Sequence, residues 1–244
     1  MVRAILLILL ISSPSLSGAF MSDEEVAVLQ KTTAGWDAGD RIAVWAEQFI
    51  DVPYDTDPLG EYVRRNLIVA DERVDCMYHT FRSVELAMGK DPAESVALAL
   101  EKRFQRKGVV EDERVVNYGD RFRYGEDMIE SGKWGREITS ELGETVWVKG
   151  KPGRENVSLI PKRDILKALD RLRNGDIIFF VKAPEKRVEG EIIGHIGIIK
   201  REQEHVYLIS AFGQKNKGGM VKKVLLSEYS AEMTFIGIKV TRME

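Results

Sequence analysis

Cys76 is the only cysteine of the chain, and an amphipathic stretch that predicts a helix follows it. Asp75 precedes it and is a residue type that caps helix N-termini, so the thiol would lie in the first turn, at the positive end of the helix dipole. This position favours the nucleophilic thiolate, and the nearby backbone N–H groups can stabilise an oxyanion. The alternative is a buried structural thiol, which is a common fate for a free cysteine.

A second residue with useful chemistry, His195, lies far along the chain. Gly194 and Gly197 flank it in an otherwise apolar segment that predicts a buried strand, and we expect the two glycines to leave open space beside the ring. Brought next to Cys76 by the fold, His195 would be the base of a thiol hydrolase. Taken alone, such a histidine is more commonly a hydrogen-bonded core residue.

His79 competes with His195 for the role of partner. It follows Cys76 by three residues and would share a helix face with it, as half of a metal site would. A zinc site also needs further thiols or histidines, and the chain has one cysteine, while His205 falls in a polar turn. We therefore expect His79 to pack behind the nucleophile, and we expect neither a metal nor a cofactor.

The elements that must position these residues come as helices first and strands later. This order indicates an α+β fold with N-terminal helices packed on a mostly antiparallel sheet. Helices are expected over residues 22–50 with breaks at Gly35 and Gly39, and over 77–88, 91–107 and 161–172. Strands are expected over 176–182, 192–199, 205–211, 220–225 and 234–240, and residues 115–153 are expected to be rich in loops.

Composition places the chain among soluble globular proteins. It has 244 residues, of which 44% are hydrophobic and 31% charged. The net charge of −3 and the isoelectric point near 5.8 give no electrostatic case for nucleic-acid binding. A single cysteine excludes an intramolecular disulfide.

The N-terminus has the pattern of a secretory leader. Arg3 is followed by the apolar run 4–11 and by small residues up to Ala19, so residues 1–19 are interpreted as a cleavable signal peptide. The run is too short to span a bilayer, so no stable membrane span is expected after cleavage. Residues 22–244 would then form one domain, exported to the periplasm or envelope. If translation starts at Met21, the protein would be cytoplasmic.

Several short segments, in this order and spacing, resemble the NlpC/P60 superfamily of papain-like cysteine peptidases and amidases. Within it they are similar to the N-acetylmuramoyl-L-alanine amidase-like branch named domain of unknown function 1460. The resemblance spans roughly residues 45 to 240 and implies a papain-like fold. The segments are 52–54 and 58–61 (VPY, PLGE), 75–76 (DC), 117–124 (NYGDRFRY), 174–179 (NGDIIF), 194–198 (GHIGI) and 207–211 (YLISA).

The resemblance implies a catalytic set in which Cys76 is the nucleophile and His195 the base. The superfamily's third polar residue, usually a histidine that orients the base, falls on Ser210 here. A serine can accept from the ring N–H but gives less orientation and less charge stabilisation. The residues directly after the cysteine also depart from the family pattern, being larger than usual.

For substrate binding, the resemblance places Tyr54 and Asp75 where the superfamily holds the amine or carbonyl end of a muropeptide. An aspartate can bind a cationic amine and a tyrosine hydroxyl can donate to the ligand. We expect Tyr118, Arg121 and Tyr124 to form one wall of the groove. The alternative is that the two tyrosines are core aromatics and the arginine a surface charge.

The hypothesis is therefore an exported cysteine hydrolase that cleaves an amide bond of peptidoglycan, with a muropeptide as its partner. A second hypothesis is a catalytically degenerate module that binds the envelope, which Ser210 favours. A third is a thiol acyltransferase that acts on lipid. A thiol-reactive activity probe separates the second hypothesis from the others, and digestion of peptidoglycan fragments separates the first from the third.

Overall fold

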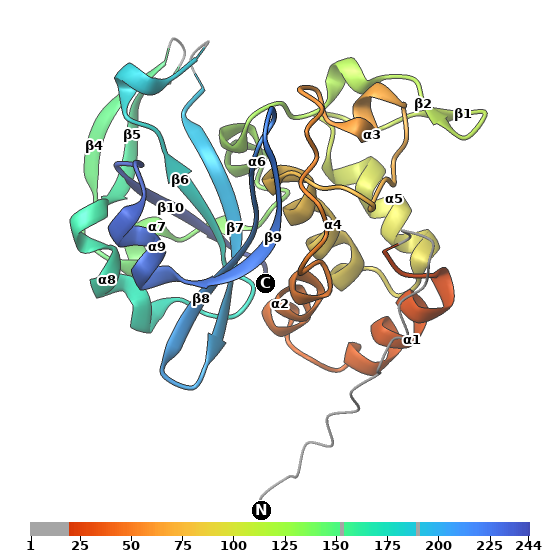
Figure 1. Cartoon of the computed structure of the whole chain (residues 1–244), viewed down its shortest axis with the longest axis horizontal. Helices are drawn as coiled ribbons and strands as arrows, with labels where there is room; N and C mark the ends of the chain where they lie inside the picture. Colours follow the sequence, from red (N-terminus) through yellow and green to blue (C-terminus); the bar gives the residue numbers. More distant parts are fainter. Residues whose placement is uncertain (1–19, 152–153, 189–190) are drawn as a thin grey trace, which may run out of the picture.

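A computed structural model of the chain describes residues 20–151, 154–188 and 191–244. The expected signal peptide, residues 1–19, lies outside the described residues. Helices from the N-terminal half form one layer, and an antiparallel sheet from the C-terminal half forms the next (Figure 1). This is the α+β arrangement that the element order predicts.

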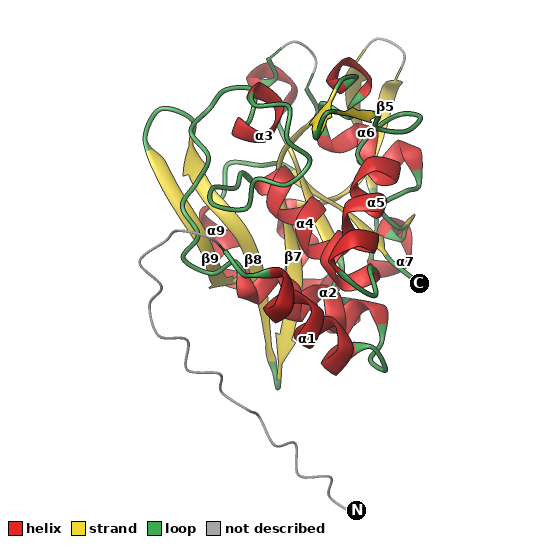
Figure 2. Cartoon of the chain, turned by 90° about the vertical axis from the view of Figure 1, so that its right-hand side faces the viewer, coloured by secondary structure: helices red, strands yellow, loops and turns green. Residues whose placement is uncertain are grey.

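Four helices make up the helical layer, and Figure 2 shows them in front of the sheet. They are α1 (Asp23–Thr33), α2 (Ala38–Gln48), α4 (Cys76–Met88) and α5 (Pro92–Lys102). Asp91 caps α5 through a hydrogen bond from the Glu94 amide, as its sequence signals predict. The helix ends at Lys102, five residues before the predicted end.

The break between the first two helices differs from the prediction. It lies at residues 34–37, and Gly39 belongs to the first turn of α2 rather than interrupting a helix. A Cβ at Gly39 would lie 2.2 Å from the Asn174 carbonyl oxygen. The glycine is therefore explained by the close approach of α2 to the turn before the sheet, which no local pattern reveals.

The main sheet is antiparallel throughout and contains the five predicted strands. Its order is β4-β5-β10-β6-β7-β8-β9, with β3 also paired to β10. The strands are β3 (Arg136–Glu137), β4 (Val146–Lys151), β5 (Arg154–Pro161), β6 (Ile177–Val181), β7 (Ile193–Glu202), β8 (His205–Gln214), β9 (Gly218–Leu225) and β10 (Gly237–Arg242).

Sequence patterns missed several smaller elements. The β4–β5 hairpin lies partly in the segment expected to be loop-rich, and helix α9 (Leu226–Glu232) lies between the last two predicted strands. The others are α3 (Glu61–Arg64), α6 (Gly125–Ser131), α7 (Thr139–Leu142), β1 (Val110–Glu111) and β2 (Arg114–Val115), with 3-10 turns at Tyr118–Asp120 and Pro184–Lys186. The helix predicted over residues 161–172 is present as α8 (Ile165–Ala168), which 3-10 turns at Lys162–Asp164 and Leu169–Arg171 flank.

The sheet buries both of its faces. Ile196 and Ile198 of β7 point towards α2 and α4 and join the larger apolar core. Ile199 of the same strand and Phe180 of β6 point to the opposite face, where α7, α8 and α9 cover a second core. Burial on both faces explains the continuous apolar runs of the central strands.

A buried ionic cluster holds α4 in place. Arg103 of the α5 C-cap lies 2.6 Å from Glu85 of α4, and their side chains are 1% and 0% exposed. Arg82, also on α4, lies 2.8 Å from Asp71 in the preceding loop. Glu85 joins the two pairs, since Arg82 also lies 3.3 Å from it, and its removal would leave the buried Arg103 without an opposite charge.

Candidate active site

Cys76 is the first residue of α4, and Asp75 is its N-cap. One Asp75 carboxylate oxygen accepts a hydrogen bond of 2.8 Å from the Tyr78 amide. The cysteine is partly buried. This confirms the predicted place of the thiol at a helix N-terminus.

The sulfur of Cys76 lies where two strands separate. Pairing of β7 with β8 starts at Ile198 opposite Ile209, so Ile196 has no backbone partner on that side. Its carbonyl accepts a hydrogen bond from the Ser210 hydroxyl, and its amide lies close enough to Cys76 to act on the pKa of the thiol. Because the N–H and C=O of a strand residue point the same way, the thiol and the hydroxyl occupy one gap between the strands.

The resting thiol is protonated rather than activated, in contrast to the expectation from the helix dipole. Burial, with a smaller contribution from the adjacent Asp75 carboxylate, raises the pKa of Cys76 to about 12. The Ile196 amide and the Lys215 ammonium act in the opposite direction but do not compensate. A nucleophilic Cys76 therefore needs a base to remove its proton during the reaction.

His195 immediately precedes Ile196 in β7. It pairs with Phe180 of β6, so its ring shares the sheet face covered by α9. The ring is surrounded by aromatic rings at centroid distances of 5.2 to 6.3 Å, namely those of Phe180, Phe212, Tyr229 and Phe235. Its Nε2 atom is buried and has no hydrogen-bond partner among the described residues.

Burial lowers the pKa of His195 to about 4, so the imidazole is neutral at pH 7 and can accept a proton. The thiol and the ring flank one peptide unit, the thiol from the strand gap and the ring from the α9 side. A charge on Cys76 also raises the pKa of Tyr229, one of the rings around His195. The two candidate catalytic groups thus lie within electrostatic range of the same side chain.

The glycines beside His195 do not leave open space, contrary to the prediction. A Cβ on Gly194 would lie 2.5 Å from Lys182, and one on Gly197 would lie 2.4 Å from Leu208. Neighbouring side chains already fill both positions. The glycines are explained by close packing around β7 rather than by room for a substrate.

Ser210 lies on β8, in the strand gap beside β7, and is fully buried. Its hydroxyl donates to the Ile196 carbonyl at 2.5 Å, so its proton is directed to the backbone rather than to the His195 ring. This contact fixes the carbonyl of the residue whose amide faces the thiol. Ser210 therefore joins β8 to β7 at the point where their backbone pairing has ended.

Tyr54 and Asp75 lie beside the thiol. Burial raises the pKa of Tyr54, and the charges of Cys76, Asp75 and Asp55 raise it further, which places the phenol near all three. The second Asp75 oxygen does not face an empty groove, because the ammonium of Lys215 lies 3.0 Å from it. Sequence patterns missed Lys215, since nothing local in a Gly/Lys/Asn turn shows which carboxylate a lysine reaches.

Of the three residues expected to form a wall, Tyr118 and Arg121 are in contact with each other, and Tyr124 lies at the start of α6. Tyr118 is buried, packs against Phe104, and donates a hydrogen bond from its hydroxyl to a backbone carbonyl. It is therefore a core aromatic, which was the alternative interpretation. Arg121 donates to the Tyr118 carbonyl at 2.9 Å. Tyr124 is the N-cap of α6, and its ring lies 5.1 Å from the Lys151 ammonium.

A further positioning residue, Glu126, was not predicted. Its carboxylate is 1% exposed and accepts hydrogen bonds from the amides of Ile192 and Ile193, while Lys151 neutralises its charge. These contacts fix the start of β7, two residues before His195. A glutamate in a helical segment gives no sequence signal for this role.

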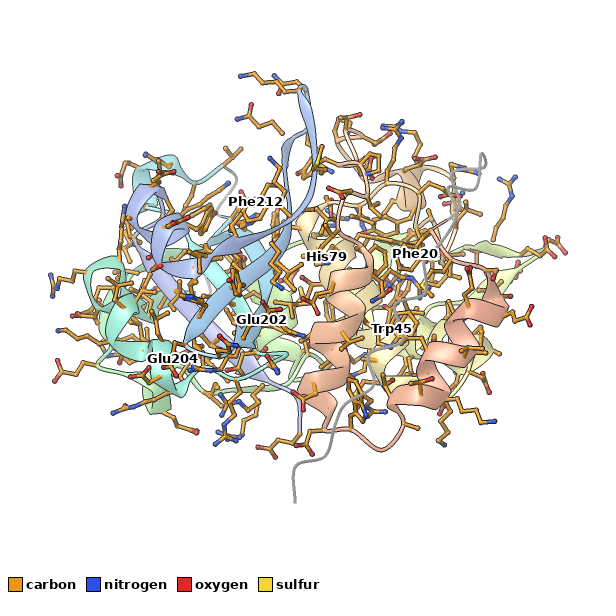
Figure 3. The ribbon with its side chains drawn as sticks, turned by 60° about the horizontal axis from the view of Figure 1, so that its bottom comes forward. Phe20, Trp45, His79, Glu202, Glu204 and Phe212 are labelled. Carbon is orange, nitrogen blue, oxygen red and sulfur yellow. The ribbon has the colours of Figure 1, made fainter. Side chains whose placement is uncertain are left out.

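His79 packs behind the nucleophile, as predicted, and is completely buried between α4 and α2. Its Nε2 lies 3.3 Å from the Ala46 carbonyl, and the ring meets Phe49 edge to face. Figure 3 shows His79 with Trp45 on the helical side of the molecule and Phe212 on the sheet side. Within the described residues, no group of three or more His, Cys, Asp or Glu side chains could hold a metal ion.

We predict that His79 makes the fold acid-sensitive. Burial lowers its pKa to about 4 in the folded chain, against an ordinary value of 6.5. Between these pH values only the unfolded chain takes up the proton, so stability falls as the pH drops below 6.5 and the loss is complete near 4. Urea unfolding at pH 7 and pH 5 should differ by about 2 kcal/mol from this residue alone.

The variant His79→Gln should lose that share of the pH dependence, because glutamine can still donate to Ala46 but does not titrate. His195 contributes in the same direction and remains in the variant. His205→Gln is the matched control, since His205 is exposed. An unchanged difference between pH 7 and pH 5 in His79→Gln would show that its burial does not govern acid stability.

Solved structures share this fold across most of the chain. A protein of Legionella pneumophila from domain of unknown function 1460 superposes with a TM-score of 0.69 at 15% identity, over 89% of this chain and 93% of its own. An N-acetylmuramoyl-L-alanine amidase of Bacteroides uniformis gives 0.64 at 19% identity, over 85% and 99%. A candidate xylanase of Bacteroides fragilis gives 0.58 at 18% identity, over 82% and 99%. At these identities the likeness concerns the fold alone.

No family model matches the sequence, and no curated protein matches it either. A search for membrane-spanning segments in the described part of the chain finds no helix with the length and apolar character required.

Proposed function

We propose that this chain is an exported, papain-like cysteine hydrolase of the NlpC/P60 type that cleaves an amide bond in peptidoglycan. The observation that carries the proposal is the position of the Cys76 thiol at the N-terminus of α4, beside the Ile196 peptide unit. That unit directly follows His195, a neutral and half-buried histidine. The fold shared with an N-acetylmuramoyl-L-alanine amidase supports the substrate class. The leader pattern of residues 1–19 supports export.

In the proposed reaction, His195 takes the proton of the Cys76 thiol as the sulfur attacks the amide carbonyl carbon. The tetrahedral intermediate collapses by breaking the C–N bond, and the imidazolium gives its proton to the leaving amine. Water then attacks the thioester while His195 accepts its proton, and the carboxylic acid and the thiol are released. Amide N–H groups at the start of α4 are suited to stabilise the oxyanion.

The two shifted pKa values fit these roles. A thiol with a pKa near 12 stays protonated until substrate binds, and a histidine with a pKa near 4 stays free to accept a proton across the neutral range. Ser210 acts by holding the Ile196 peptide unit, and Tyr54 contacts the substrate beside the thiol, while Asp75 caps α4 and pairs with Lys215. Tyr118 belongs to the core and not to the binding site.

The test is digestion of defined muropeptides followed by mass spectrometry of the products. Hydrolysis of the bond between muramic acid and L-alanine would release a complete stem peptide with a free amine, and hydrolysis within the stem would release shorter peptides. Either product supports the proposal and identifies the bond. If every muropeptide stays intact while the protein still binds it, the degenerate binding module replaces the hydrolase.

A further inference from the structure

Asp75, the carboxylate beside the candidate nucleophile, forms an ion pair with a lysine of the same chain. Lys215 lies in the turn between β8 and β9, and its ammonium lies 3.0 Å from Asp75 and 3.3 Å from the Asp55 carbonyl oxygen. The same ammonium lies 5.6 Å from the centre of the Tyr54 ring. Lys215 therefore contacts both residues that the resemblance assigns to substrate binding.

The turn that carries Lys215 is held against Tyr54. The Tyr54 amide donates to the Gly219 carbonyl at 2.9 Å, and a Cβ on Gly213 would lie 2.3 Å from the tyrosine ring. Glycines on both strands of the hairpin thus let its backbone pack on the ring. This packing fixes the position of the backbone that carries Lys215. The ion pair between Lys215 and Asp75 is therefore part of the folded site.

An ammonium has three N–H donors. In Lys215, Asp75 and the Asp55 carbonyl take two of them, and one donor remains. The lysine side chain is 34% exposed, so this donor can be reached from solvent. Asp75, at 20% exposed, has its second oxygen taken by the lysine and its first by the Tyr78 amide.

We propose that Lys215 is a specificity-determining residue that makes this site refuse peptides with a free amino terminus and accept peptides whose terminal nitrogen is acylated. A free amine is a second cation, and it would have to displace Lys215 from Asp75 or lie beside its charge. An acylated nitrogen is neutral, and its acyl oxygen can accept the remaining Lys215 donor. This inference rests on the proposed function, because it assigns the substrate class of the same site.

The experiment measures binding separately from hydrolysis. A stem tripeptide with a free amino terminus and its N-acetyl form are titrated by calorimetry into the Cys76→Ala protein and into the Cys76→Ala/Lys215→Met double variant. We expect the substitution of Lys215 to improve affinity for the free-amine peptide about tenfold, since Asp75 becomes available to it. Affinity for the N-acetyl peptide should stay the same or fall.

Lys217→Met is the matched control, because Lys217 belongs to the same turn and is exposed. It should leave both affinities unchanged. An unchanged ratio of the two affinities in the Lys215→Met background would overturn the inference, and so would the failure of both peptides to bind any variant.

Hydrolysis by the proteins that retain Cys76 then distinguishes this inference from the proposed function. A gain in free-amine binding without any cleavage of muropeptides would keep the assignment of Lys215 and overturn the hydrolase. Cleavage with an unchanged preference would keep the hydrolase and overturn the assignment.

Discussion

The variant Cys76→Ala is expected to lose muropeptide cleavage by at least about 10⁴-fold in kcat, because the proposed covalent intermediate forms on the Cys76 sulfur. The chain has one cysteine, so no second thiol can replace it. Alanine is well tolerated in a first helical turn, and the Asp75 cap does not depend on the cysteine side chain. The measurement is product formation from a defined muropeptide under single-turnover conditions.

Cys76→Ser is the companion variant, since it keeps the size of the side chain and replaces the sulfur with a far weaker nucleophile. Both variants should melt within a few degrees of the parent protein and still bind the muropeptide. Retention of more than a tenth of the parent rate in either variant would show that the thiol is not the nucleophile.

The variant His195→Gln should lower kcat by about 10² to 10⁴-fold, the usual contribution of a general base. In the parent protein the rate should be flat through neutral pH and fall on the acid side, because His195 becomes protonated only near its pKa of about 4. Glutamine does not titrate, so this acid limb should be absent from the variant. Initial rates are compared at pH values where circular dichroism shows both proteins folded.

His205→Gln serves as the control for this second variant, because it removes an exposed histidine. It should keep both the rate and the acid limb. An acid limb that persists in His195→Gln would assign the titration to another group, and a near-normal rate would show that the ring, enclosed by aromatic side chains, does not reach the thiol.

The central elements could be predicted because their signals are local. The Asp75 cap, the stripe of apolar residues after Cys76 and the terminating Gly89 define α4 to within one residue. The apolar runs define β6 and the start of β7 equally well, whereas β7 continues three residues beyond its predicted end, to Glu202. These segments carry both candidate catalytic residues, which is why sequence analysis reached them.

The missed features depend on contacts between distant segments. The ionic cluster of Arg103 and Glu85, the ion pair of Lys215 and Asp75, and the Glu126 contact to β7 join residues that no periodic pattern relates. From sequence alone, a charged residue in a turn or helix is predicted to be solvent-exposed, because its distant partner is not known.

The pKa of the Cys76 thiol likewise could not be predicted from local sequence. Its position in the first helical turn was predictable, and that position favours ionisation. The observed burial against β7 and the neighbouring Asp75 carboxylate outweigh the helix dipole and raise the pKa instead. Depth of burial is set by how α4 packs on the sheet, and local sequence does not specify that depth.

The most direct test of the central claim is to digest a muropeptide in the presence of hydroxylamine and to weigh the products. A thioester on Cys76 would divide between water and this added nucleophile, so the account predicts a hydroxamate together with the carboxylic acid. The hydroxamate should be absent with Cys76→Ala. Carboxylic acid alone at every hydroxylamine concentration, formed equally by Cys76→Ala, would contradict a covalent cysteine mechanism in this protein.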